Sequence, residues 1–330
     1  MRVVVFGASG NVGSAVVRAL GQEPQVNAIV GVARRRPDWV PPKTAWVSAD
    51  VARDDLQRIV RGADAVVHLA WQFQPTHDPY ATWESNGIGS ARLLDALGEA
   101  DVPVLVYASS VGAYSPNLDD DPVDETWPTH GWPAAAYGRE KAYVERLVDA
   151  YVARFPDRRV VRLRQAFVFQ TESASQQRGL FAGPLLPGRL IGRGLMPILP
   201  WPHGLRFQAV HADDLADAYC RAILDPVRGA FNIAAEPIVT GERLAALLRA
   251  RLLPIPPQLV RGSMWGAWRA HVLPAPPELF EMALRLPVMS TRRAGAELGW
   301  SPRHSGIDAV SAFLDGLRQG ARGPTPPLSA

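Results

Sequence analysis

Tyr137 and Lys141 are the two side chains of this sequence whose types and spacing most directly suggest chemistry. They stand four residues apart, so a helix would place the phenol and the ammonium on one face. A free tyrosine has a pKa of about 10, and a nearby positive charge favours its phenolate. Lys43 is the only other lysine in the chain. The pair predicts acid–base chemistry near neutral pH, with Lys141 supplying the charge; a ring and a solvated charge on a surface helix are the alternative.

A glycine-rich turn follows the first apolar segment of the chain. Residues 2–6 have the pattern of a buried strand, and residues 12–20 have the apolar spacing of a helix. The glycines therefore fall between a strand and a helix, where they let the backbone approach a pyrophosphate at the helix N-terminus. An ordinary glycine turn is the alternative. The residues predicted to bind a dinucleotide here are Gly7, Ser9, Gly10, Asn11, Val12 and Gly13.

Arg34 stands where a second strand, residues 26–32, is expected to end. In dinucleotide-binding folds, an acidic residue about 20 residues beyond the last glycine binds the ribose 2′-hydroxyl. This chain instead has Ala33 followed by three arginines. Since a guanidinium pairs with phosphate in a bidentate fork, Arg34 favours a 2′-phosphate and hence NADP as the cofactor. The alternative is NAD, with the arginines forming a solvated loop.

Apolar segments alternate with helical segments through the first half of the chain. Further strands are expected at residues 45–48, 65–70 and 102–107. This alternation is typical of a parallel sheet covered on both faces, with ligands at the carboxyl ends of its strands. We therefore predict an α/β fold, a Rossmann-type doubly wound parallel sheet with a smaller C-terminal substrate domain. Gly7, Ser110 and the helix of Tyr137 should meet in one crevice, and Asp50 and Val51 should lie by the adenine.

The sequence also suggests how the domains divide. We expect an NAD(P)-binding Rossmann domain at residues 1–165 plus 208–233, because the later segment should return a helix and a strand to the sheet. Residues 166–207 plus 234–320 would form the substrate-binding domain, and residues 321–330 a flexible tail. The proline-rich segment 252–286 predicts a pair of substrate-domain helices. An apolar flap against a membrane or a partner is the alternative.

The order and spacing of these motifs resemble the extended short-chain dehydrogenase/reductases, the family of NAD(P)-dependent epimerases, dehydratases and reductases. The resemblance covers most of the chain. The motifs that carry it are Gly7-x-x-Gly10-x-x-Gly13, Asp50-Val51, His68-Leu69-Ala70-Trp71, Asn86, Tyr107-Ala108-Ser109-Ser110, Tyr137-x-x-x-Lys141, Val210-His211-Ala212-Asp213-Asp214-Leu215-Ala216, Phe231-Asn232-Ile233 and Leu298-Gly299-Trp300-Ser301-Pro302.

The resemblance implies roles for the catalytic residues. Tyr137 would be the general acid–base, and Lys141 would hold the nicotinamide ribose and lower the pKa of the tyrosine. Ser110 would hydrogen-bond the substrate oxygen, and Asn86 would help to organise the lysine and its water. The residues implied to contact the cofactor outside the glycine turn are Arg34, Asp50, Val51, Leu69, Ala70, Trp71, Tyr137 and Lys141. The family commonly dimerises through the helices expected at residues 81–100 and 136–155, which implies a homodimer.

The chain departs from the family pattern where the substrate would bind. Residues 165–171 replace the usual proline and Tyr-Gly-Pro motif. Sugar-nucleotide members place an arginine for the diphosphate just before the His-x-x-Asp segment, but here Arg206 is offset by one position and Phe207 stands in its place. Many aromatic residues nearby favour a bulky or apolar carbonyl compound as the small-molecule substrate. The candidate substrate contacts are Ser110, Phe169 and Arg206.

Three classes of function fit these observations. The first is an oxidoreductase that acts on a carbonyl or secondary alcohol with net cofactor turnover. The second is a sugar or nucleotide-sugar epimerase or dehydratase, which recycles its cofactor within one cycle. The third is a non-catalytic dinucleotide-sensing protein. Intact Ser110, Tyr137 and Lys141 argue against the sensor, and the altered diphosphate pattern favours the first class over the second.

Composition adds limits on partners and location. The 330 residues carry a net charge of +3, from 35 basic and 32 acidic side chains, too balanced for nucleic-acid binding by charge alone. Cys220 is the single cysteine and the histidines are scattered, so we expect no disulfide and no metal site. His211 and Asp213 are interpreted as structural polar groups at a helix start. No segment resembles a signal peptide or a membrane span, so we expect a cytoplasmic location.

Overall fold

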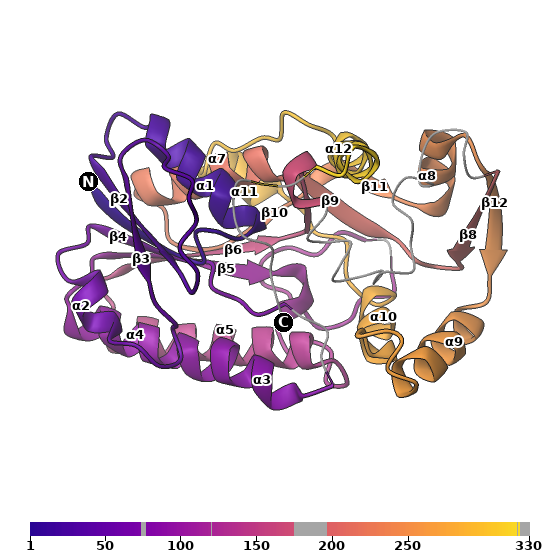
Figure 1. Ribbon diagram of the computed structural model, residues 1–330, viewed down its shortest axis with the longest axis horizontal. Helices are drawn as coiled ribbons and strands as arrows, with labels where there is room; N and C mark the ends of the chain where they lie inside the picture. Colours follow the sequence, from indigo (N-terminus) through magenta and orange to yellow (C-terminus); the bar gives the residue numbers. More distant parts are fainter. Residues whose placement is uncertain (74–76, 120, 175–196, 322, 324–330) are drawn as a thin grey trace.

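A seven-stranded parallel sheet forms the centre of the nucleotide-binding half of the chain (Figure 1). The computed structural model describes residues 1–73, 77–119, 121–174, 197–321 and 323. The strands follow the order β10-β6-β5-β4-β1-β2-β3. The order reverses beside β1, which is where a doubly wound sheet opens a ligand crevice. The strands are β1 (Arg2–Phe6), β2 (Ala28–Ala33), β3 (Thr44–Ser48), β4 (Ala65–His68), β5 (Val104–Ser110), β6 (Arg159–Gln165) and β10 (Gly229–Ile233).

Alternate side chains of β1 enter two cores on opposite faces of this sheet. Val3 and Val5 pack in one core, and Val4 and Phe6 pack in the other. Both faces are covered by helices, so the strands are near-continuous apolar runs and the predicted fold class is confirmed. One face carries α1 (Asn11–Gln22), α7 (Ala212–Leu224) and α11 (Arg292–Glu297), and the other carries α2 (Leu56–Val60), α4 (Gly89–Glu99) and α5 (Ala136–Arg154) (Figure 1).

Helices were predicted at residues 136–155, around Tyr137, and at residues 81–100, around Asn86, and both segments are helical. Helix α5 begins at Ala136, and its buried positions recur every three or four residues, as in an amphipathic helix. Lys141 and Glu145 occupy two of these buried positions although both are ionisable. The helix predicted at residues 81–100 is divided into α3 (Pro79–Trp83), a π-helical turn (Glu84–Ile88) and α4.

Smaller elements form the remainder of the molecule. A three-stranded sheet has the order β11-β9-β7, and β12 pairs with β8. The segment predicted as a helix pair contains α9 and α10, which lie together at one end of the molecule (Figure 1). The elements are β7 (Phe167–Phe169), β8 (Ile198–Pro202), β9 (Phe207–His211), β11 (Ala235–Val239), α8 (Gly241–Leu248), β12 (Arg251–Ile255), α9 (Pro257–Arg269), α10 (Pro277–Ala283) and α12 (Gly306–Gln319).

The segment predicted to return to the large sheet does so only in part. Helix α7 packs on α1, and β10 pairs with β6. Strand β9, at the start of the segment, instead joins the small sheet between β7 and β11. The division into two domains stays a prediction. Of the predicted flexible tail, residues 322 and 324–330 lie outside the described residues.

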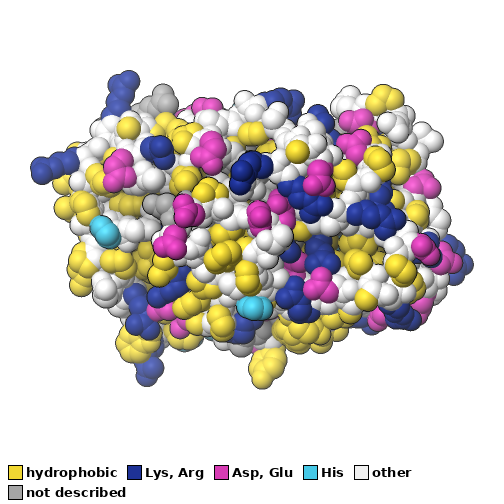
Figure 2. Space-filling view, turned by 180° about the vertical axis from the view of Figure 1, so that it is seen from behind, with side chains coloured by type: hydrophobic (Ala, Val, Ile, Leu, Met, Phe, Trp, Pro, Cys, Tyr) yellow, Lys and Arg dark blue, Asp and Glu magenta, His cyan; other side chains and the backbone are white. Residues whose placement is uncertain are grey.

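The surface carries charges of both signs. Figure 2 shows basic and acidic side chains interspersed over the face seen from behind, as the near-balanced composition predicts. Across the described ranges, every helix is too short or too polar to reach across a bilayer.

Candidate active site

A cavity of about 350 Å³ opens at the carboxyl ends of the parallel strands. Asn86 and Arg206 are the predicted site residues that do not line it. The strands β1, β2, β4 and β5 each deliver lining residues from their last positions or from the loop that follows. The predicted residues in the lining are Gly7, Ser9, Gly10, Asn11, Val12, Gly13, Arg34, Asp50, Val51, Leu69, Ala70, Trp71, Ser110, Tyr137, Lys141 and Phe169.

The glycine turn is built from close backbone contacts. Gly7 has a φ of +78°, and a Cβ there would lie 2.7 Å from the backbone nitrogen of Ala70. A Cβ on Gly13 would lie 2.2 Å from the carbonyl oxygen of Gly7. Gly10 caps α1 without a side-chain hydrogen bond, so no cap side chain covers the first N–H groups of the helix. This arrangement suits a pyrophosphate at the helix N-terminus.

Tyr137 and Ser110 form a hydrogen-bonded pair in the same cavity. The Tyr137 hydroxyl donates to Ser110 Oγ at 2.9 Å, and Ser110 Oγ also accepts the N–H of Gly112 at 3.0 Å. Gly112 has to be small, because a Cβ would lie 2.6 Å from the tyrosine ring. Burial raises the pKa of Tyr137 to about 12, although the hydrogen bond with Ser110 opposes the rise. Burial is the larger of these two influences, and the lowering of this pKa by Lys141 that the resemblance implied stays a prediction.

Lys141 is buried beside this pair. Its Nζ donates to the carbonyl oxygen of Ala108 at 2.8 Å and lies 3.4 Å from the centre of the Trp71 ring. Burial lowers the pKa of Lys141 to about 7, and the carboxylates of Glu145 and Glu140 oppose the fall. Lys141 therefore holds its proton much less strongly than an exposed lysine does.

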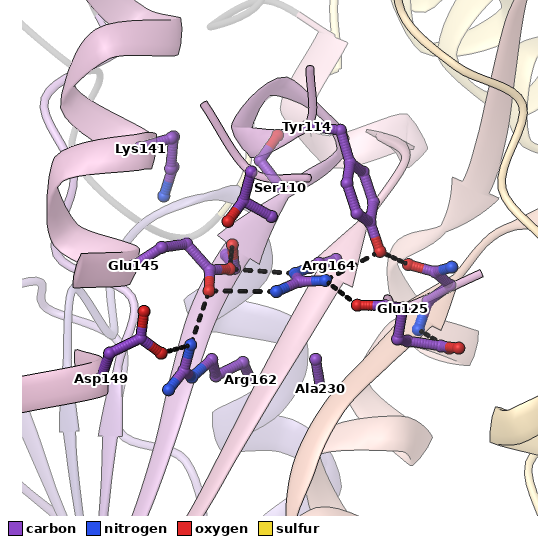
Figure 3. A network of polar contacts seen from close by, with 12 residues as sticks. Ser110, Tyr114, Glu125, Lys141, Glu145, Asp149, Arg162, Arg164 and Ala230 are labelled. Atoms are coloured by element: carbon purple, nitrogen blue, oxygen red, sulfur yellow. Dashed lines mark hydrogen bonds and ion pairs between the residues drawn. The ribbon is translucent and has the colours of Figure 1, made fainter. Parts of the chain in front are cut away.

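Glu145 lies one helical turn beyond Lys141 and anchors a buried ion-pair network (Figure 3). Its carboxylate accepts hydrogen bonds from Arg164 at 3.0 Å and Arg162 at 2.8 Å. It also accepts the hydroxyl of Ser109, the neighbour of Ser110, at 2.6 Å. Burial alone would raise the pKa of Glu145, but the two arginines and Ser109 outweigh it and lower the pKa to about 2. Glu145 is therefore charged throughout the physiological range.

Asn86 lies outside the cavity lining, where it hydrogen-bonds to Gln72 and Glu140. It accepts the N–H of Gln72 at 2.7 Å and donates to the Gln72 carbonyl at 3.1 Å. It also donates to Glu140 at 2.6 Å. Among the described residues, no hydrogen bond joins Asn86 to Lys141. Its contacts fix the loop after β4 at Gln72 and hold Glu140 near the lysine.

Of the residues predicted to bind the nucleotide or the substrate, Arg34 and Asp50 line the cavity and Arg206 does not. Arg34 is exposed at the cavity, where its carbonyl accepts the Ser48 hydroxyl at 2.9 Å. Asp50 also lines the cavity, but its carboxylate already accepts the N–H of Ala52 at 2.9 Å. Arg206 lies outside the lining and donates to the carbonyl oxygen of Asp119 at 2.8 Å.

Sequence reasoning missed part of the cavity wall and its support. Met282 and Leu286 line the cavity from the α10 region, far along the chain from Tyr137, and no local signal marks them. Glu145 carried a signal, since it follows Lys141 by four residues and therefore shares its helix face. His211, interpreted as a structural group, is the N-cap of α7 and accepts the N–H of Asp213.

The parallel sheet and the Tyr137–Ser110–Lys141 cluster define the chain as an extended short-chain dehydrogenase/reductase. It belongs to the NAD dependent epimerase/dehydratase family, whose sequence profile matches residues 3–234.

Two curated relatives show how much sequence is shared. One uncharacterised protein of Mycobacterium tuberculosis is 28% identical over 265 residues, which are 79% of this chain and 25% of that protein. The chain thus spans about a quarter of the length of the curated relatives that match first. Another uncharacterised protein of the same organism is 28% identical over 346 residues, covering 98% of this chain and 85% of that protein.

Solved structures show the same fold at lower identity. UDP-glucose 4-epimerase of Thermotoga maritima, solved with UDP-glucose, has a TM-score of 0.74 and 19% identity, covering 97% of this chain and 99% of that one. DesIV, a dTDP-glucose 4,6-dehydratase of Streptomyces venezuelae solved with NAD, has a TM-score of 0.72 and 20% identity, covering 98% and 99%.

Proposed function

We propose that this chain is an NAD(P)-dependent oxidoreductase that transfers a hydride to or from a carbonyl compound or secondary alcohol. The observation that carries the proposal is that Tyr137, Ser110 and Lys141 line the same cavity as the glycine turn. An oriented dinucleotide and one proton donor are what carbonyl reduction requires. Membership of an NAD-dependent family supports the cofactor class.

The residues of the cavity fit a nicotinamide dinucleotide. The N–H groups at the start of α1, beyond Gly10, would hold the pyrophosphate, and Asp50 with Val51 would lie by the adenine. Lys141 uses one of its three donors on Ala108, which leaves donors for the ribose hydroxyls. A bound cofactor would supply or accept the hydride.

The proton moves through the tyrosine. In the reducing direction, Tyr137 gives its hydroxyl proton to the carbonyl oxygen of the substrate while Ser110 Oγ donates a hydrogen bond to the same oxygen. A substrate oxygen that replaces the Tyr137–Ser110 bond of 2.9 Å would lie within reach of both hydroxyls. The phenolate that remains is stabilised by the charge of Lys141. Oxidation of an alcohol runs the same steps in reverse.

We propose NADP as the preferred cofactor, with Arg34 as the residue that selects it. Arg34 is exposed at the cavity, and its guanidinium forms no ion pair with any residue that the structure describes, so it is available for a 2′-phosphate. Titration calorimetry with NADP⁺ and NAD⁺ tests this. We expect wild type to bind NADP⁺ about 10-fold or more tightly, as one charge-assisted pair allows, and Arg34→Ala to lose the preference while NAD⁺ affinity holds. Tighter binding of NAD⁺ by wild type would refute the assignment.

The substrate proposed is a neutral carbonyl compound with a bulky or apolar body. The charged residues in the described lining are Arg34, Asp50 and Lys141, all assigned to the cofactor or the proton transfer. Phe169 packs against Phe207 and Phe313 at the cavity wall. Other apolar side chains of the wall include Phe73, Val111, Phe167, Met282 and Leu286. Such a surface favours apolar substrate atoms over a diphosphate.

A sugar-nucleotide epimerase or dehydratase is the second candidate, because the solved neighbours carry those activities. The experiment that separates the two follows the cofactor. Purified protein is given NADPH or NADH with a panel of neutral aryl and alkyl ketones, and separately UDP-glucose or dTDP-glucose. Net oxidation of the cofactor with a ketone supports the oxidoreductase. Conversion of a sugar nucleotide with an unchanged cofactor pool would establish the epimerase or dehydratase instead.

We also propose that the chain forms a homodimer through the outer surface of α5 and of the helical segment at residues 81–100. Tyr143 and Val152 expose apolar surface there, at 39% and 37%, and Trp83 packs on Tyr143 at 4.7 Å between ring centres. Light scattering of wild type and of a Tyr143→Glu, Val152→Glu double variant tests this; a wild-type monomer would refute it. The cytoplasmic location stays a prediction.

A further inference from the structure

The ammonium of Lys141 has few polar partners for a buried charge. Lys141 is 4% exposed, and its one hydrogen bond within the described residues goes to the carbonyl oxygen of Ala108. An ammonium carries three N–H donors, so two find no acceptor there. The two nearest carboxylates are committed elsewhere: Glu145 to its arginines and Ser109, and Glu140 to Asn86 and Thr82.

The indole of Trp71 gives the ammonium of Lys141 an attractive partner that is not a hydrogen-bond acceptor. Lys141 Nζ lies 3.4 Å from the centre of the Trp71 ring, well inside the roughly 6 Å at which a cation and a ring attract. The rings of Tyr107 and Tyr137 are farther, at 5.3 Å and 6.0 Å. Tryptophan is the strongest partner for a cation among the aromatic side chains, and the attraction grows when water is excluded.

The position of Trp71 is itself fixed by packing. Its ring meets that of Tyr137 edge-on at 5.9 Å between ring centres. The backbone of the next residue, Gln72, is bonded on both sides by the buried side chain of Asn86. The indole N–H is buried and has no acceptor within the described residues. Contacts with other rings therefore hold the indole in place, and the face of the indole lies toward the ammonium of Lys141.

We propose that Trp71 is a positioning residue for Lys141, whose indole face keeps the buried ammonium charged and beside Tyr137. The contact between Trp71 and Lys141 does not depend on the proposed function. Only its importance for turnover rests on that function, in which a charged lysine stabilises the phenolate of Tyr137. Other titratable and charged groups also face this ammonium or stand behind it, and they are unchanged by substitution of Trp71. They are His68 from β4, Tyr107 from β5, Arg162 and Arg164 from β6, and Tyr137, Glu140 and Glu145 from α5.

The protonation of Lys141 can be measured directly because the chain has only two lysines. Carbon-13 labelling of lysine gives two Cε signals, and exposed Lys43, bonded to the Glu23 carbonyl, is the internal control. We expect Trp71→Leu to lower the titration midpoint of Lys141 by about one pH unit or more, and Trp71→Phe to lower it less. Phe169→Leu removes another ring from the cavity wall and should leave the midpoint unchanged. An unchanged midpoint in folded Trp71→Leu would overturn the proposal.

A second measurement needs no substitution. The Cε protons of a lysine stacked on an indole face are shifted upfield by the ring, so Lys141 should lie clearly upfield of Lys43 in the wild-type protein without cofactor. Matching proton shifts would overturn the proposal even if Trp71→Leu failed to fold. Neither readout involves turnover. A lowered midpoint in a protein that reduces no carbonyl compound would uphold the role of Trp71 while refuting the proposed function.

Discussion

At the scale of single residues, Tyr137 and Lys141 are both driven toward their neutral forms. Burial raises the pKa of the phenol to about 12 and lowers that of the ammonium to about 7. A charged lysine nearby would favour the phenolate in this cavity. The charge of Lys141 therefore depends on neighbours that the motif does not contain, namely Trp71 on one side and the carboxylates of Glu140 and Glu145 on the other.

Removing the tyrosine hydroxyl tests the assigned acid–base. We expect Tyr137→Phe to bind the cofactor as wild type does, because the hydroxyl bonds to Ser110 and not to the glycine turn. Turnover should fall about 10²- to 10⁴-fold, the usual contribution of a positioned proton donor. Calorimetry and steady-state kinetics measure the two effects. Tyr80→Phe is the control, since Tyr80 is 80% exposed, and wild-type turnover by Tyr137→Phe would refute the role.

At the scale of elements, the turn between β1 and α1 depends on glycine at particular contacts. Gly7 adopts a left-handed φ and touches the backbone after β4, and Gly13 lies against the carbonyl of Gly7. These contacts bring α1 close to the end of the sheet. The predicted strand, turn and helix were correct here because apolar periodicity and glycine spacing are local signals.

A methyl group at Gly13 should disrupt this turn. Its Cβ would lie 2.2 Å from the Gly7 carbonyl oxygen, so the helix start must move. We expect Gly13→Ala to lose cofactor binding and to cost about 1–3 kcal/mol of unfolding free energy, as overpacking does. Gly262→Ala is the matched control: Gly262 lies in α9 with nothing within 4 Å of its added Cβ, so that variant should gain about 0.5–1 kcal/mol. Calorimetric titration and chemical denaturation measure both.

At the scale of the whole molecule, the network around Glu145 joins distant segments beneath the site (Figure 3). Arg164 bonds both Glu145 and the hydroxyl of Tyr114, which donates to Asn232 in β10. Asn232 in turn donates to the carbonyl of Ser290. The network thus ties α5 and β6 to the last strand of the sheet and to the segment that precedes α11. Its parts come from five separate stretches of the chain.

Because of this network, the free energy of unfolding should fall at acidic pH. The folded-state pKa of Glu145 is about 2, below its ordinary value of 4.5. Its stabilisation is therefore present above about pH 4.5 and is lost as the pH falls toward 2. We expect Glu145→Gln to lose about 3–5 kcal/mol at neutral pH, because two arginines lose a buried partner. In denaturant unfolding, the difference in unfolding free energy between Glu145→Gln and wild type should narrow as the pH falls from about 4.5 toward 2. Asp315→Asn, which breaks an exposed ion pair with Arg318, should show almost no gap.

The sequence by itself determined the alternation of strands and helices in the first half of the chain, the glycine turn and the Tyr137–Lys141 pair. Each of these rests on the spacing of residues that are close together in the sequence. Only the tertiary structure decided that Trp71 lies on Lys141, that Arg164 reaches Glu145, and that residues near α10 complete the cavity. Those contacts join residues far apart in the sequence. Periodicity predicts which face of an element is buried, but it does not predict which distant side chain will pack against it.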